Sequence, residues 1–487
     1  MPSAAPSRPA LFSVSCLPTR QHILTQWWPS VRTRTSLTLA LGIALLSGCS
    51  LSTPVPQSTV QAPSQWNSTA DSLVWPQARW WAEYDAPQLS RLMAQARTGN
   101  LDLATAATRL LQADAQLRQS GASLLPSVDG GASGRRGGNS GDGDVSNSFG
   151  ATLSASYEVD FWGRNRATVA AAAANLNASR YDLEALAIST DASVASSWFQ
   201  LVENQARLQL ARDNLAAAER VLTIVEARYR YGADDSLALS PQRALVAQLR
   251  ANLPALEQQT LQLRNSLALL LGQGPDFAPG TLPDMAAIRV PEPGAGLPSE
   301  LLNRRPDIRA SEQRLLAANA NLTAARAALY PSIQLTGSYG AQSSVLSELV
   351  SNPLNPWSLA AGLTQPIFDG GRLRAQVEIS EASQQEALIG YQRAILDALI
   401  DADTALGALQ QARLQYQLQQ AATEEAQLAF ELAEARYKAG AIDLQNLLDT
   451  QRSFFQSQDS LVQQRAAWLQ ATIDLYRALG GGWQDFA

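Results

Sequence analysis

The sequence contains the same pattern twice, at a spacing of about 205 to 209 residues, and this duplication limits the architectures open to the chain. Individual residues match in order, so the repeat is more than a shared composition. The first copy contains Asp102, Arg109-Leu110-Leu111, Pro126-Ser127, Glu226-Ala227-Arg228-Tyr229 and Gln242-Arg243. Their counterparts are Asp307, Arg314-Leu315-Leu316, Pro331-Ser332, Glu434-Ala435-Arg436-Tyr437 and Gln451-Arg452. We therefore expect two versions of one structural unit.

The two repeats are expected at 87–271 and 299–480, joined by a Pro/Gly-rich linker at 272–298. A polar arm, 49–86, precedes them and a short tail, 481–487, follows. Each repeat is predicted to run helix, strand, loop, strand, very long helix, turn, long helix. The strands are predicted at about 127–136, 148–161, 331–341 and 356–368, and the long helices at about 163–231, 241–271, 371–438 and 443–479.

The strand pattern is clearest between Phe149 and Phe161, where odd-numbered residues are apolar and even-numbered residues are mostly polar. A membrane barrel strand and one face of a soluble sandwich both have this period, so the pattern alone leaves both open. Four strands cannot close a barrel, and an open sheet edge is not tolerated in lipid. A membrane interpretation therefore requires several copies to share one barrel, and three copies would supply twelve strands.

The predicted helices after the strand pairs are unusually long, because no proline interrupts Gly163–Tyr231 or Gly371–Lys438. Each stretch could extend about 100 Å at 1.5 Å per residue. Apolar residues recur every seven positions, which predicts left-handed coiled-coil packing, and Gly-containing turns at 231–234 and 439–442 predict antiparallel hairpins. A plain helical bundle would explain the heptads but not the strand pair before each long helix. The clearest heptad series is Leu201, Leu208, Leu215, Leu222 and Tyr229.

The N-terminal region ends in Leu45-Leu46-Ser47-Gly48-Cys49, which follows a short apolar run and resembles a lipoprotein signal. We expect residues 1–48 to be cleaved and Cys49 to be lipidated. The apolar run is roughly ten residues, about half of what a membrane-spanning helix needs, so a retained transmembrane anchor is the weaker interpretation. Ser50, rather than an acidic residue, follows the cysteine, which favours the outer membrane.

Removing residues 1–48 also removes His22, the only histidine, and Cys16, one of two cysteines. Disulfides, histidine–metal sites and Ser-His or Cys-His nucleophiles are then excluded by inventory. The full chain has a formal net charge of −6, and the loss of four arginines makes the mature chain more acidic, so nucleic-acid binding is not expected. We expect neither an enzyme nor a cofactor or metal site.

Five motifs follow one another along the mature chain: Trp80-Trp81 with Tyr84-Asp85 and Leu89, Tyr157 to Arg164, Arg304 to Ile308, Gln365 to Arg372, and Leu475 to Trp483. With these motifs the chain resembles the TolC/OprM-like outer-membrane factors, specifically the lipidated NodT-type efflux branch. The resemblance implies an α+β membrane protein, in which a homotrimer forms a twelve-stranded outer-membrane β-barrel continued by a helical periplasmic tunnel. It further implies, as partners, a periplasmic adaptor (membrane fusion) protein, an inner-membrane pump of the resistance-nodulation-division (RND) class and outer-membrane lipid.

The resemblance also suggests where the channel closes. Asp449 lies where members of the family place a carboxylate ring at the periplasmic entrance, and Gln445 and Asn446 lie where some relatives have a leucine and a second aspartate. Three crowded carboxylates would repel one another and attract cations. The alternative is that Asp449 only caps or solvates a helix start.

Several further residues are expected at turns and tips. Gly163 and Gly370-Gly371 permit a sharp strand-to-helix turn. Residues before the two hairpin turns are expected to tether neighbouring hairpins shut or to meet the adaptor, and the alternative is that they are simply solvated helix ends: Arg228, Tyr229, Arg436, Tyr437 and Lys438.

Three functions remain open at this level. The leading hypothesis is a passive exit duct for drugs or other small toxic compounds in a tripartite efflux system. The second is a duct for type I protein secretion, and the third is a lipid-anchored coiled-coil spacer without a pore. The sequence does not identify the exported compounds, because a wide tunnel selects little.

Overall fold

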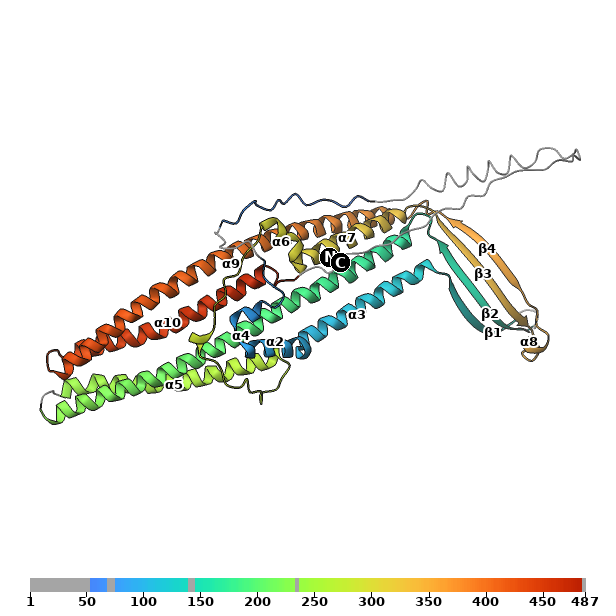
Figure 1. Ribbon diagram of the computed structural model, residues 1–487. Helices are drawn as coiled ribbons and strands as arrows, with labels where there is room; N and C mark the ends of the chain where they lie inside the picture. Colours follow the sequence, from blue (N-terminus) through green and yellow to red (C-terminus); the bar gives the residue numbers. More distant parts are fainter. Residues whose placement is uncertain (1–52, 68–74, 139–144, 233–235, 484–487) are drawn as a thin grey trace, which may run out of the picture. The chain divides into compact units, whose positions relative to one another are not determined.

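The computed structural model describes residues 53–67, 75–138, 145–232 and 236–483 (backbone only at 236–238), all within one compact unit. Figure 1 labels the elements, and the repeat is visible in their order. The first copy contains α3 (Leu101–Gly121), β1 (Ser127–Gly138), β2 (Val145–Val159), α4 (Arg164–Arg230) and α5 (Ser236–Leu270). The second contains α7 (Pro306–Ala327), β3 (Ser332–Ser343), β4 (Trp357–Thr364), α9 (Arg372–Lys438) and α10 (Leu444–Ala478). Shorter elements are η1 (Trp80–Tyr84), α2 (Pro87–Gly99), η2 (Ala122–Leu124), η3 (Met285–Ala287), α6 (Pro298–Arg304) and α8 (Glu348–Ser351).

The four strands form one antiparallel sheet in the order β1-β2-β3-β4, so the two repeats join through the β2–β3 pair. Residues directly opposite one another in such a sheet share a face. The register therefore gives the sheet one largely apolar face and one largely polar face, although Arg136, Asn147 and Ser343 lie on the apolar side near the loop ends of their strands. The apolar face carries Val128, Phe149, Leu153, Tyr157, Val159, Ile333, Leu335, Tyr339, Trp357, Leu359 and Leu363.

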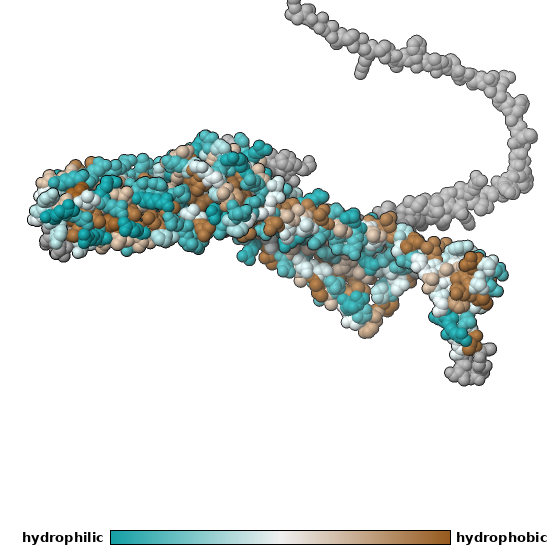
Figure 2. All heavy atoms as spheres, turned by 90° about the horizontal axis from the view of Figure 1, so that it is seen from below, coloured by the Kyte–Doolittle hydropathy of each residue, from teal (hydrophilic) through white to brown (hydrophobic). Residues whose placement is uncertain are grey.

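The polar face is held in part by hydroxyl pairs across the strands. Ser127 and Ser156 lie 2.8 Å apart, as do Ser338 and Ser358. Hydrophobic residues gather over part of the sheet, at the right of Figure 2, whereas the long helices have a mostly hydrophilic surface with smaller hydrophobic areas. The expected four strands and long helices are confirmed.

Two strands end earlier than the sequence pattern indicated. β2 ends at Val159 rather than 161, because the next residue, Asp160, turns to accept hydrogen bonds from the first turn of α4. β4 ends at Thr364 rather than 368, shortly before Pro366, whose nitrogen cannot donate to a strand ladder. Helix α5 also begins at Ser236, ahead of the predicted 241, and continues through Pro241 and Pro254.

The long helices pack as two hairpins. Helices α4 and α9 have 67 residues each, and α5 and α10 have 35 each. Helix α4 packs against α5, α9 packs against α10, and α10 also packs against α4, which brings the hairpins together. Among the described helices, none has a stretch long and apolar enough to cross a membrane.

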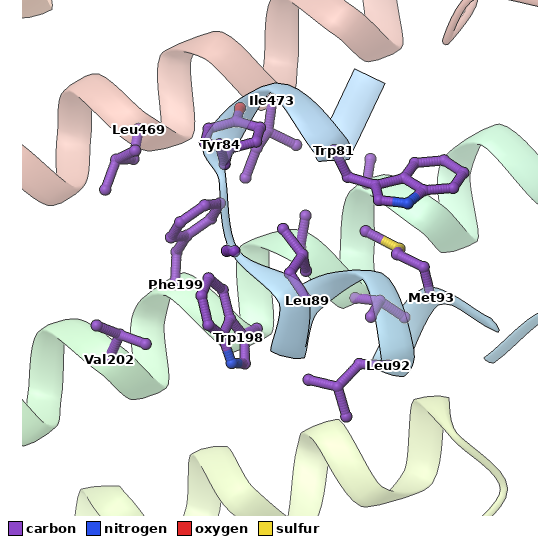
Figure 3. Packing of buried hydrophobic residues seen from close by; sticks show 14 of the residues in the cluster. Trp81, Tyr84, Leu89, Leu92, Met93, Trp198, Phe199, Val202, Leu469 and Ile473 are labelled. Atoms are coloured by element: carbon purple, nitrogen blue, oxygen red, sulfur yellow. The ribbon is translucent and has the colours of Figure 1, made fainter. Parts of the chain in front are cut away.

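An aromatic cluster anchors η1 and α2 on the middle of α4 and the C-terminal part of α10 (Figure 3). Trp80 stacks on Tyr476 with ring centroids 4.8 Å apart, and Trp198 is fully buried. The Tyr84 hydroxyl makes a hydrogen bond with Thr472, and the Tyr476 hydroxyl donates to Glu83 at 2.6 Å. The motif residues at 80–84 therefore form a structural anchor between the two repeats.

The N-terminal arm and the linker are also fixed to the helices. The Trp66 indole donates to the Gly296 carbonyl at 3.1 Å, and the Asn67 backbone N–H donates to Asp403 at 2.9 Å. Arg465 donates to three linker carbonyls, those of Met285, Ala286 and Ile288, each at 2.9 Å.

Candidate functional site: the hairpin tips and the strand-to-helix turns

The ends of the two hairpins meet in a small apolar cluster. Tyr437, near the end of α9, has only 1% of its surface exposed. It packs with residues from α4, α5, α9 and α10: Val221, Val225, Leu239, Phe430, Ala433, Leu444, Leu447 and Leu448. The tips are therefore joined by a core of their own, separate from the aromatic cluster.

Arg228 connects the first hairpin to the second. Its guanidinium carbon lies 4.8 Å from the centroid of the Tyr437 ring, and its Nη1 donates to the Tyr437 carbonyl at 3.2 Å. A cation over an aromatic face is attracted by the electron-rich ring. Of the five predicted tip residues, these two are brought together within the chain.

The other three predicted tip residues lie apart from this pair. Tyr229 is 44% exposed, and Arg436 is exposed. Lys438 pairs with Glu434, one turn earlier on the same helix, at 2.7 Å.

The residues predicted to form the gate lie on the first turns of α10. Asp443 caps this helix by accepting from the Asn446 backbone N–H at 2.9 Å and from its side-chain amide at 2.7 Å. Gln445 donates to both carboxylate oxygens of Asp449, at 2.9 and 3.0 Å. Asp443, and not Asp449, therefore caps the helix. Asp449 remains exposed, with its carboxylate oriented by Gln445.

The predicted glycine turns precede the longest helices. Gly163, Gly370 and Gly371 have φ values of 79°, 67° and 88°, a region that favours glycine. Gly163 and Gly371 occupy the N-cap positions of α4 and α9, where a side chain would be strained.

Two aspartates that the sequence analysis did not select complete these turns. Asp160 accepts from the backbone N–H groups of Asn165 and Arg166, each at 2.9 Å. Asp369 accepts in the same way from Gly371 and Leu373, at 3.0 and 2.9 Å. The hydrogen bond from the Leu373 N–H lowers the pKa of Asp369, and desolvation of the carboxylate offsets only part of this effect. The hydrogen bond from the Gly371 N–H lowers the pKa further, so that it lies below its usual value. An aspartate just before a helix is the signal that could have identified both.

One predicted residue cannot be placed. Cys49 lies outside the described residues, as does part of the first predicted hairpin turn, residues 233–235.

An antiparallel sheet segment leading into two very long helical hairpins, with an internal repeat, defines a class of outer-membrane channel protein. The chain belongs to the outer membrane efflux protein family, whose model matches residues 92–273 and 297–481. The chain is thus an outer-membrane channel of tripartite efflux systems, and it extends into the periplasm.

Curated relatives cover nearly the whole chain. The pyoverdine export outer membrane protein OpmQ of Pseudomonas putida is 41% identical over 459 residues, covering 92% of this chain and 97% of that protein. The cation efflux system protein CusC of Escherichia coli is 32% identical over 446 residues, covering 90% and 97%. The open-state structure of the Neisseria gonorrhoeae MtrE outer membrane channel superposes with a TM-score of 0.80 at 32% identity, covering 89% and 98%.

Proposed function

We propose that three copies of this chain assemble into one conducting channel, with their strands forming a shared twelve-stranded barrel. The observation that carries this proposal is the sheet itself. Within the described strands, β1 and β4 each pair on one side only, and unpaired edges are not tolerated in lipid. The apolar face would meet lipid and the polar face would line the water-filled lumen.

The surface of α9 supports assembly as well. Five large apolar side chains project from it, separated by fourteen, four, ten and four residues, and at 3.6 residues per turn these spacings keep all five within about 80° around the helix axis. They find too little cover within their own chain to be buried. They are Ile400 (63% exposed), Leu414 (47%), Leu418 (63%), Leu428 (51%) and Leu432 (52%). A neighbouring copy would bury this row.

The channel serves a tripartite system in which a periplasmic adaptor and an inner-membrane RND-type pump deliver the substrate. Relatives named as antibiotic and toluene efflux components support drugs or other small toxic compounds as substrates. A second candidate is a pyoverdine-like siderophore, because the identity to the pyoverdine exporter is 41%, against 31% to the antibiotic and toluene efflux proteins.

Lipid on Cys49 anchors the chain, and a ring of Asp449 carboxylates narrows the periplasmic entrance.

Complementation separates these substrates. A strain that keeps the adaptor and pump but lacks its own outer-membrane channel receives this chain, and a matched strain also lacks the pump. We expect the chain to reduce drug accumulation, or to restore siderophore release into the medium, only where the pump is present. An effect that persists without the pump, or no effect on either class, would contradict the proposal.

A further inference from the structure

The duplicated tips share the sequence Glu-Ala-Arg-Tyr and the same backbone turn, but their contacts differ. Arg228 and Tyr229 of the first copy correspond to Arg436 and Tyr437 of the second. Both helices end in the same way: Gly232 and Gly440 each have a φ of 73°, and their N–H groups donate to the carbonyls of Tyr229 and Tyr437 at 3.1 and 3.0 Å. The local structure therefore does not explain the difference in contacts.

One Arg–Tyr combination is satisfied inside the chain and the other is not. Arg228 covers the ring of Tyr437, as described above, and that tyrosine is buried. In the part of the chain that the structure describes, no hydrogen bond, ion pair or ring contact is found for the side chains of Arg436 and Tyr229. Arg228 of the first copy thus contacts the tyrosine of the second copy. Within the described residues, the equivalent arginine of the second copy, Arg436, covers no tyrosine of its own chain.

The apolar residue one turn before each arginine also differs in burial between the two copies. Arg436 follows Leu432 and Leu428 at intervals of four, so the three residues lie along one face of α9. In the first copy, Ile224 corresponds to Leu432 and packs against the tip cluster beside Arg228. Leu432 is 52% exposed. Ile224 and Arg228 of the first copy thus pack against the second hairpin, whereas the corresponding Leu432 and Arg436 of the second copy are exposed to solvent.

We propose that Arg436 of one copy covers Tyr229 of the next copy, so that an interchain Arg–Tyr contact repeats the intrachain contact between Arg228 and Tyr437. The occupant of the exposed α9 face is then the first hairpin of a second copy of this chain. Six similar contacts, three within chains and three between them, would close a ring of hairpin tips. This inference rests on the proposed trimer and adds which side chains meet at its periplasmic end.

Cross-linking tests the contact directly. The chain has only two cysteines, Cys16 and Cys49, and neither falls within the bounds of α4, α5, α9 or α10. Tyr229→Cys/Arg436→Cys is treated with a short bismaleimide, and native mass spectrometry of the same sample records how many chains assemble. Glu226→Cys/Arg243→Cys is the positive control for reagent length, because these side chains of α4 and α5 lie 2.9 Å apart within one chain and are accessible to the reagent. Tyr229→Cys/Lys438→Cys is the matched negative control, because position 438 lies on another side of the same helix turn.

The expected result is a trimer in which the 229–436 pair forms covalent dimers and trimers as readily as the 226–243 pair forms its internal link. The 229–438 pair should give markedly less. Trimers that lack the 229–436 link, or that link 229–438 equally well, would overturn this inference and leave the proposed trimer intact. Single chains in the mass spectrum would overturn both.

Discussion

Replacing Leu153 by arginine tests the assignment of the two sheet faces. Leu153 lies opposite Gly130 and Tyr339 and is one residue from the midpoint of β2, which runs from Val145 to Val159. Because the midpoint of a barrel strand lies near the bilayer midplane, the Leu153 side chain lies at the depth where a charged residue destabilises the barrel most. We expect Leu153→Arg to reduce the free energy of unfolding by about 2–4 kcal/mol per chain.

Ser154→Arg is the matched control, because the next residue along a strand points to the opposite face. Ser154 lies opposite Asp129 and Ser338 on the polar face, so arginine there should change conductance with little effect on stability. The measurement is urea unfolding of the protein folded into phospholipid vesicles, followed by tryptophan fluorescence. An equal cost at both positions, or a larger cost at Ser154, would refute the assignment of faces.

Three further predictions concern the gate, the turns and the anchor. Asp449→Ala should raise single-channel conductance and weaken block by divalent cations, because it removes a focused cation site. Gln445→Leu should lower the conductance, because it adds an apolar ring. If Asp449→Ala channels keep the wild-type conductance and cation block, a carboxylate ring is excluded. Asp160→Ala should cost about 0.5–2 kcal/mol of stability, measured by thermal unfolding, because two backbone N–H groups lose their acceptor. Burial alone would raise the pKa of Asp160, but the Arg166 and Asn165 N–H groups and the Arg166 guanidinium lower it below its unfolded value. The contribution of ionised Asp160 to the free energy of unfolding is therefore present above the unfolded pKa and is lost as the pH falls through the folded pKa. Asp160→Asn should flatten the acid side of the plot of stability against pH. An unchanged plot would contradict the capping role of Asp160. Cys49→Ala should leave an unprocessed or differently processed precursor, and mass spectrometry of the mature N-terminus would contradict lipidation if the wild-type chain began at another residue.

Much of the fold was predictable because it depends on periodic patterns. Alternation in residues 149–159 indicates a strand with two unlike faces, and long proline-free stretches with seven-residue spacing indicate the helices that became α4 and α9. The ends of these elements were less predictable. Asp160 fits the polar phase of the strand, and only its hydrogen bonds to the first turn of α4 reveal that it leaves the sheet.

Contacts between distant segments were the least predictable. Trp80 was visible only as part of a motif, and its stacking on Tyr476 depends on how the first and last parts of the chain pack together. Likewise, Arg228 and Tyr437 were predicted as tip residues, but the sequence did not indicate that they contact each other across the hairpins. Such contacts follow from tertiary packing, which no local period encodes.

Single-channel recording in planar bilayers tests most directly whether this chain forms an open path for solutes. Purified, full-length wild-type protein is inserted into the bilayer and the current is recorded at fixed voltage in salt. We expect discrete conductance steps that divalent cations reduce from the periplasmic side. Protein that inserts as an assembled oligomer yet carries no current would contradict a channel and favour a non-conducting coiled-coil spacer.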